Sequence, residues 1–251
     1  MSKRLIIDAN YCDRLTLGSG ESVCLRLIRP SDKASMLRAF GELSEHSRHK
    51  RFFGAKQTLT EAELRYFTET DGWDHFALAA VIVHENGEEG DGLAIARCIR
   101  FADDPECAEV AITVIDRVQG KGIGRALLER LIIAAIERDI RRFRFECLVH
   151  NQELQQLVHN VCQVVDTRSD GEIMIVETKL PAQLPEASVS SASQNRRFDL
   201  YELFRAIAIQ SVDLQMSLNR AAIRRGIKMP LSGADLLRHI KRPSRSDRHG
   251  N

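Results

Sequence analysis

The chain has 251 residues, 43% of them hydrophobic and 28% charged, which is the composition of an ordinary globular protein. Its 36 basic and 35 acidic side chains leave a formal net charge of +1, which argues against nucleic-acid or membrane binding by the whole domain. Because no apolar run approaches the ~18 residues of a membrane span and the first residues lack the apolar core of a signal peptide, we expect a cytoplasmic protein.

Strand-like runs recur between residues 23 and 179. The run 109–114 shows the pattern best, because it alternates in polarity and is rich in β-branched residues. In chain order, strands are expected over 23–28, 76–83, 93–101, 107–115, 143–148, 164–166 and 173–179. The segment 85–92, rich in Gly and Glu, predicts a turn between the second and third of them.

Helical runs alternate with these strands. They are expected from residues 29–32 onward, over about 60–70, over 125–136 and from Asn151 onward. Thr60 with Glu63 three positions later is a capping box. The run 125–136 is helical both in propensity and in the spacing of its apolar residues.

The segment 119–124, Gln-Gly-Lys-Gly-Ile-Gly, joins the strand over 107–115 to the helix over 125–136. Three glycines in five residues let the backbone turn sharply and leave no side chains over the first helical N–H groups. These N–H groups and the positive end of the helix dipole form a site for phosphate oxygens. The sequence therefore predicts a ligand that carries a pyrophosphate.

Three phosphate-binding loops compete for this segment. A P-loop needs Ser or Thr after Gly-Lys, but Gly122 follows Lys121. A dinucleotide-binding turn needs Gly-x-Gly-x-x-Gly and an acidic residue at the end of the next strand, whereas Glu146 falls inside its strand. The third loop is Gln-x-x-Gly-x-Gly after a strand, the acetyl-CoA pyrophosphate loop of the GNAT N-acetyltransferase superfamily. Gln119, Gly122 and Gly124 occupy its fixed positions, and the chain resembles a member of that superfamily.

The resemblance implies a GNAT fold of the α/β class over residues 23–180, with a mixed, mostly antiparallel sheet flanked by helices. It implies acetyl-CoA as co-substrate, no metal, and direct transfer of the acetyl group to a primary amine. The residues expected to contact acetyl-CoA are Ile112, Val114, Gln119, Gly120, Lys121, Gly122, Ile123, Gly124, Arg125 and Asn151.

The segments 43–48 and 51–54 are similar to those of bacterial protein-lysine acetyltransferases of the Pat type. This similarity makes a protein lysine the leading acceptor. Two alternatives stay open: a small-molecule amine as acceptor, and a non-catalytic regulatory or scaffold protein that binds acetyl-CoA.

Transfer to an amine calls for a base, because a free lysine with a pKa of about 10.4 is almost entirely protonated at neutral pH. Glu109 is the only carboxylate inside its strand, and it shares a face with Ala111 and Thr113. In related acetyltransferases a glutamate near this place acts as the base, so Glu109 is our candidate. A solvated glutamate on an exposed face is the plainer interpretation, and His150 and His159 are alternative bases.

Two positions depart from the superfamily pattern. The helix after Asn151 often carries a tyrosine that protonates the departing thiolate, and here that position is Val158. The same helix usually ends in Gly-Phe, where Cys162 and Gln163 stand instead. These departures leave the general acid unassigned and the geometry of the last strands open.

The cysteines show no paired spacing typical of a metal site. They are Cys12, Cys24, Cys98, Cys107, Cys147 and Cys162. We expect a reduced protein without structural disulfides. Cys107 and Cys147 have no evident base beside them in the sequence, so neither is favoured as an acyl-accepting nucleophile.

The ends of the chain differ from the central domain. Residues 1–22 are interpreted as a lead-in, 181–197 as a linker and 198–251 as a helical extension with a basic tail. The run 199–225 has a single apolar stripe that must be buried against its own domain, a second copy or another protein.

Overall fold

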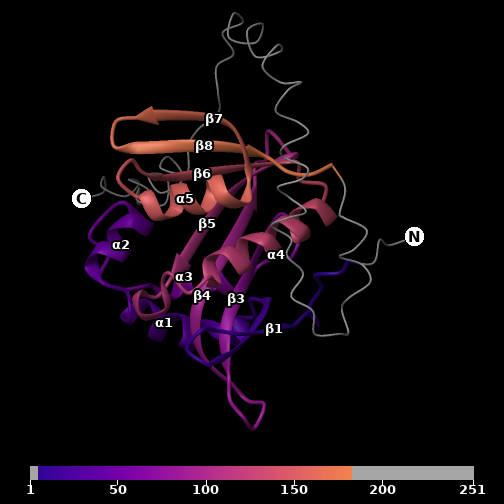
Figure 1. Ribbon diagram of the computed structural model, residues 1–251, viewed down its shortest axis with the longest axis vertical. Coiled ribbons are helices and arrows are strands. Elements are labelled where there is room, and N and C mark those ends of the chain that lie inside the picture. The colour runs from indigo at the N-terminus through magenta and orange to yellow at the C-terminus, as the bar shows by residue number, and fades with distance from the viewer. Residues whose placement is uncertain (1–4, 183–251) are drawn as a thin grey trace, which may run out of the picture. The chain divides into compact units, whose positions relative to one another are not determined.

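The computed structural model describes residues 5–182, which form one eight-stranded sheet flanked by helices (Figure 1). The strand order is β1-β2-β3-β4-β5-β6-β8-β7. β5 and β6 run parallel, and every other neighbouring pair is antiparallel. The predicted fold class is therefore confirmed. The predicted linker over 181–197 lies almost wholly outside the described residues, and the predicted helix over 199–225 lies entirely outside them.

The strands are β1 (Asp13–Thr16), β2 (Ser22–Leu27), β3 (His75–Val83), β4 (Glu89–Arg100), β5 (Cys107–Val114), β6 (Arg142–Leu148), β7 (Gln163–Asp170) and β8 (Ile173–Lys179). The helices are α1 (Lys33–Gly41), α2 (Glu45–Phe52), α3 (Glu61–Thr68), α4 (Ile123–Glu137) and α5 (Gln152–Val161), with short 3-10 turns η1 (Pro30–Asp32) and η2 (Asp116–Val118). No helix within residues 5–182 has the length and apolar character needed to cross a membrane.

The main core lies between the sheet and α4, which crosses β3, β4 and β5 in Figure 1. One row of paired residues runs across five strands on this face, and each member is at most 2% exposed: Phe76, Cys98, Val110, Phe145 and Val176. Leucines of α4 such as Leu127 and Leu131 complete the same cluster. Burial of these side chains is the main favourable term that fixes the sheet on α4.

The opposite face of the sheet packs against the helices that precede β3. Ala77, Ala79 and Val81 of β3 form a second buried cluster, against which Met36 of α1 packs. Because side chains alternate along a strand, the odd-numbered residues of β5, including Glu109, belong to this second face.

Two elements escaped prediction. β1 is a four-residue edge strand that pairs with β2, so the expected lead-in over 1–22 contributes to the sheet. α2 begins after Ser44, whose hydroxyl accepts a hydrogen bond from the N–H of Ser47 at 3.1 Å. Its sequence, EHSRHKRF, is mostly charged and lacks the apolar spacing that indicates a helix.

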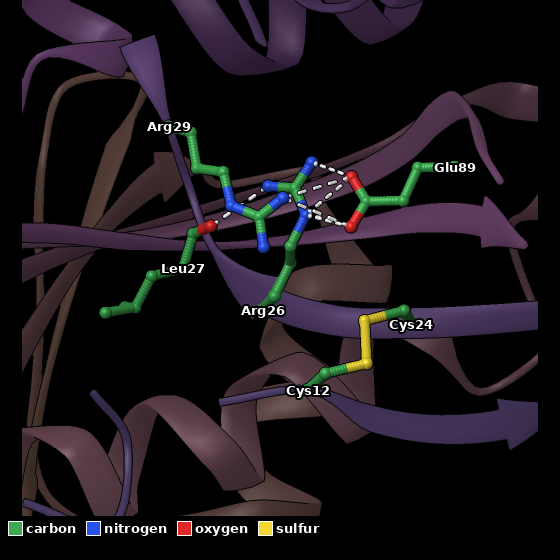
Figure 2. Close-up of a disulfide and its surroundings, with 6 residues drawn as sticks. All are labelled: Cys12, Cys24, Arg26, Leu27, Arg29 and Glu89. Carbon is green, nitrogen blue, oxygen red and sulfur yellow. Dashed lines mark hydrogen bonds and ion pairs between the residues drawn. A yellow bond between two sulfur atoms is a disulfide. The ribbon is translucent and has the colours of Figure 1, made fainter. Parts of the chain in front are cut away.

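The expectation of a protein without disulfides is wrong, because the structure pairs Cys12 with Cys24 (Figure 2). Cys24 lies on β2 opposite Arg14 of β1, and Cys12 lies just before β1. Antiparallel pairing brings the two Cα atoms to 5.8 Å, within the range that a disulfide spans. The pairing could not be predicted from the sequence because β1 itself was not.

Candidate functional site

The sheet opens between β5 and β6. These two strands pair only from Cys107–Val110 of β5 to Arg142–Phe145 of β6. β5 continues to Val114 and β6 to Leu148, beyond the last paired residues. Between Ala111 and Val114, the main-chain groups of β5 that face away from β4 therefore lie beyond the β5–β6 ladder, and we call this unpaired interval between the two strands the cleft. A ligand can form hydrogen bonds with these groups.

The predicted phosphate-binding loop, residues 119–124, lies at the open end of this cleft. Gln119 anchors it, donating hydrogen bonds from Nε2 to the Val114 carbonyl at 3.0 Å and to Ser47 Oγ at 3.3 Å. The backbone turns at Gly120 and Gly122, whose φ angles of 72° and 87° are left-handed. α4 then starts at Ile123, two residues before the start at Arg125 that the sequence predicts.

The two fixed glycines of the loop have different surroundings. A Cβ atom added to Gly122 would meet nothing within 4 Å, so this position faces open space at the start of α4. A Cβ added to Gly124 would lie 3.5 Å from Leu157 of α5 and 3.6 Å from Val114 of β5. Gly122 thus leaves room for a ligand, and Gly124 brings α4 close to its neighbours.

The first turn of α4 presents its N–H groups to the same space. Ile123 and Gly124 precede the first intrahelical bond of the helix, which Ala126 donates to the Gly122 carbonyl at 3.0 Å. Lys121 is exposed beside them. Arg125 donates from Nε to Glu129 at 2.9 Å. The structure therefore brings predicted residues 119–125 together at one helix N-terminus.

The remaining predicted contacts lie along the two diverging strands. Ile112 and Val114 are half-buried on the face that packs on α4. Asn151 follows β6, is 8% exposed, and its Oδ1 accepts a hydrogen bond from the Leu154 N–H at 3.3 Å. Its carboxamide oxygen therefore caps α5, a structural role that the sequence analysis did not assign to it.

Sequence reasoning missed Asp116, which ties α2 to the loop. Its carboxylate accepts hydrogen bonds from the Ser44 N–H at 3.0 Å, from Ser44 Oγ at 2.7 Å and from Ser47 Oγ at 2.9 Å. Burial alone would raise the pKa of Asp116, but these bonds hold it below its ordinary value. At its other end α2 reaches α5, where Lys50 forms a 2.9 Å ion pair with Glu153. α2 therefore bridges the loop after β5 and the helix after β6.

Glu109 lies where the cleft closes, one residue before the last pair of the β5–β6 ladder. It is half-buried and stands in a row with Ile99 of β4 and Arg144 of β6. Its charge acts on the guanidinium groups of Arg51 and Arg97. The plain interpretation, a fully solvated glutamate, does not describe this position.

The alternative bases and nucleophiles lie in other surroundings. His150 and His159 are exposed, and His159 Nδ1 lies 2.8 Å from the Gln155 carbonyl on its own helix. Cys107 and Cys147 are at most 2% exposed. Burial raises the pKa of Cys107 to about 11 and also raises that of Cys147, so both remain protonated thiols at neutral pH.

The departures at the end of α5 do not prevent the last strands from pairing, although the β7–β8 register shifts between Val164 and Asp166. Val158 is 1% exposed and packs in the main core, so this position supplies no proton donor. α5 ends at Val161, Cys162 is extended, and β7 starts directly at Gln163. The expected last strands both form, β7 being longer than predicted. Among residues 5–182 no three His, Cys, Asp or Glu side chains are grouped so as to hold a metal ion.

Known proteins share this arrangement. A model of the acetyltransferase (GNAT) family matches residues 44–160. "Acetyltransferase Pat" of Mycolicibacterium smegmatis is 32% identical over 163 residues, which are 65% of this chain and 47% of that protein. "Acetyltransferase PA5475" of Pseudomonas aeruginosa is 30% identical over 127 residues, which are 51% of this chain and 67% of that protein.

A solved structure agrees with these relatives. The GNAT domain of S. lividans PAT superimposes with a TM-score of 0.61 at 28% identity, over 69% of this chain and 99% of that one. The chain spans about half the length of the M. smegmatis protein and two thirds of the P. aeruginosa protein. The sequence, the fold and the cleft geometry thus lead to one assignment: the chain belongs to the GNAT family of acetyltransferases.

Proposed function

We propose that the protein transfers the acetyl group of acetyl-CoA directly to a primary amine, with a protein lysine as the leading acceptor and Glu109 as general base. This proposal rests mainly on the relative positions of three features. The phosphate-binding loop, the diverging β5 and β6 strands and Glu109 follow one another along a single path.

The path suits an extended cofactor with a phosphate at one end. The pyrophosphate would lie on the N–H groups at the start of α4, where Gly122 leaves open space. The pantetheine arm would run along β5 from Val114 toward Val110, over about 13 Å of strand. Its thioester would then reach the closed end of the cleft, beside Glu109.

Glu109 is suited to the base role by its position. The amine must lose a proton to attack the thioester carbonyl, and a carboxylate there accepts it directly or through one water. The new C–N bond forms as the C–S bond breaks, and the departing thiolate is acidic enough to leave with weak assistance. Because Val158 supplies no hydroxyl, bulk water is the proton source that this mechanism requires.

Similarity to Pat supports the protein-lysine acceptor, together with the Pat-like segments 43–48 and 51–54. The acceptor can be identified by incubating the full chain with labelled acetyl-CoA and a cell lysate. Mass spectrometry of peptides and of small metabolites then detects whether protein lysines or small amines carry the label. Labelled lysines would support the proposal, whereas label confined to metabolites would replace the protein acceptor by a small amine.

The base is tested by Glu109→Gln with Glu106→Gln as matched control. Glu106 is exposed and lies outside the strand, three positions earlier. Glu109→Gln should keep acetyl-CoA affinity, lower turnover by roughly 10²–10⁴-fold and flatten the rise of rate with pH. Unchanged turnover in this variant would remove Glu109 from the mechanism. No turnover of any amine by the unaltered protein, with acetyl-CoA still bound, would favour a regulatory role.

A further inference from the structure

A cavity lies between helices α1–α3 and the second face of the sheet, and its lining includes Arg51 and Arg97, on which the charge of Glu109 acts. Its volume is about 90 Å³, room for roughly six to nine water-sized groups. Most of its lining is apolar, including Met36, Phe40, Leu43, Phe52 and Phe67. The charged lining residues are Asp32, Arg51 and Arg97, and Asp32 is already engaged by Arg26 at 2.8 Å.

Arg97 differs from the other buried arginines. Arg26, Arg138 and Arg144 are each at most 6% exposed, as is Arg97. Arg26 and Arg144 donate to carboxylates, as Figure 2 shows for Arg26, and Arg138 donates to three main-chain carbonyl groups. By contrast, the guanidinium of Arg97 forms no hydrogen bond or ion pair within residues 5–182, and its Nε atom is buried without a partner.

The immediate surroundings compensate the charge of Arg97 incompletely. Its guanidinium lies 4.0 Å from the ring centroid of Phe67, a cation–π contact. Burial and the charge of Arg51 lower the pKa of Arg97 to about 9, and burial lowers the pKa of Arg51 too. Both groups are cationic at neutral pH, and Glu109 is the carboxylate that acts on both. Two guanidinium groups at an apolar cavity, those of Arg51 and Arg97, are therefore balanced by one carboxylate, that of Glu109.

A buried guanidinium without hydrogen bonds is costly unless a ligand completes it. A single carboxylate would restore charge balance and could accept two parallel N–H bonds from the guanidinium. The remaining cavity is apolar and small, which suits a few carbon atoms attached to that carboxylate.

We propose that the Arg97 end of this cavity is a carboxylate-binding subsite for the acetyl acceptor. The preferred acceptors then carry a carboxylate close to their amine. The amine would lie toward Glu109, the carboxylate toward Arg97 and Arg51, and the apolar part toward Met36 and Phe40. The assignment of the ligand as acceptor rests on the proposed function, whereas the carboxylate subsite itself does not.

The subsite is tested first by binding alone, with the full chain. NMR titrations with hexanoate, hexanamide and hexylamine compare one apolar tail with three head groups. We expect hexanoate to bind at least tenfold more tightly than the other two, and Arg97→Met to weaken it about 10-fold or more. Arg38→Met, on the exposed side of α1, is the matched control and should change nothing. Equal binding of the three compounds, or unchanged hexanoate binding by Arg97→Met, would overturn the subsite.

Stability separates a ligand role from a structural one. Replacing an incompletely paired buried charge by an apolar side chain should keep or raise the melting temperature. If Arg97→Met fails to fold, Arg51→Met carries the binding test, with the same loss expected and unchanged hexanoate affinity overturning the subsite. Arg97→Lys keeps the charge but loses the planar fork, so it should bind hexanoate more weakly than the unaltered protein.

A second measurement identifies which class of acceptor supplies the carboxylate that Arg97 would bind. Acetylation rates are compared for norleucine against norleucinamide, and for peptides with Asp against Asn beside a lysine. A preference for norleucine indicates free amino acids, and a preference confined to the Asp peptide indicates acidic lysine sites in proteins. No preference in either pair would overturn the acceptor role. If no amine is acetylated while hexanoate still binds, the proposed function fails and the subsite stands.

Discussion

The two fixed glycines of the predicted phosphate-binding loop should respond in opposite ways to the same substitution. Gly122 has φ 87° and ψ −3°, and a Cβ there meets no atom within 4 Å. The cost of Gly122→Ala is therefore the left-handed backbone alone, roughly 1–2 kcal/mol. Gly124 lies inside α4 without a positive φ, and its Cβ would make contacts of 3.5 and 3.6 Å. Alanine is favoured over glycine in a helix by about 0.5–1 kcal/mol, so Gly124→Ala should be neutral or stabilising.

The two free energies add to a difference of about 1.5–3 kcal/mol between the variants, or roughly 3–12 °C in melting temperature for a domain of this size. Thermal unfolding followed by circular dichroism measures it. Titration calorimetry with acetyl-CoA gives the second readout: Gly122→Ala should bind more weakly, because its Cβ enters the space over the helix N–H groups, while Gly124→Ala should bind normally. Equal melting temperatures, or a greater loss of affinity in Gly124→Ala, would refute the reasoning.

Three further predictions concern the surrounding structure. Arg26→Met removes the buried guanidinium that pairs with both Asp32 and Glu89, leaving Glu89 with Arg29 and Asp32 with the Arg29 N–H. The free energy of unfolding should fall by about 3–5 kcal/mol, measured by urea denaturation; a loss below 1 kcal/mol (roughly the value of a surface pair) would contradict it. The pKa of Asp116 is lowered in the folded state, so its stabilising effect is complete above its unfolded pKa of about 3.9 and is lost as pH falls through the folded value. The stability difference between the unaltered protein and Asp116→Asn should therefore be constant from pH 7 to about 5 and shrink only below that; a difference that grows on acidification would exclude this role. Reduction of the Cys12–Cys24 disulfide, which closes a loop with a sequence separation of 12, should cost about 2–3 kcal/mol of unfolding free energy, and a Cys12→Ser variant should show no response to the reductant.

The parts of the fold with local signals were predictable from the sequence. Strand alternation located β3 to β6, and the glycine loop located the start of α4, because both depend on neighbouring residues. α2 was not predictable, since its position depends on hydrogen bonds between Asp116 and two serines about 70 positions earlier. The buried charged neighbours of Glu109 were also not predictable from the sequence. Arg97 occupies an inward position on β4 that the strand pattern assigns to an apolar residue, and only the packing of Phe67 over it shows that it is buried.

The short β5–β6 ladder has a consequence for how the sheet moves. Four residue pairs join the strands β1–β5 to the strands β6, β8 and β7, whereas β4 and β5 share seven. The main-chain bonds along this seam are therefore few, and local opening there should need less free energy than global unfolding. Native-state hydrogen exchange would register such opening as weak amide protection along the seam, with strong protection inside both halves of the sheet. Opening at the seam would widen the space beside β5 for the arm of a cofactor, and it must occur without breaking the core that both halves share against α4.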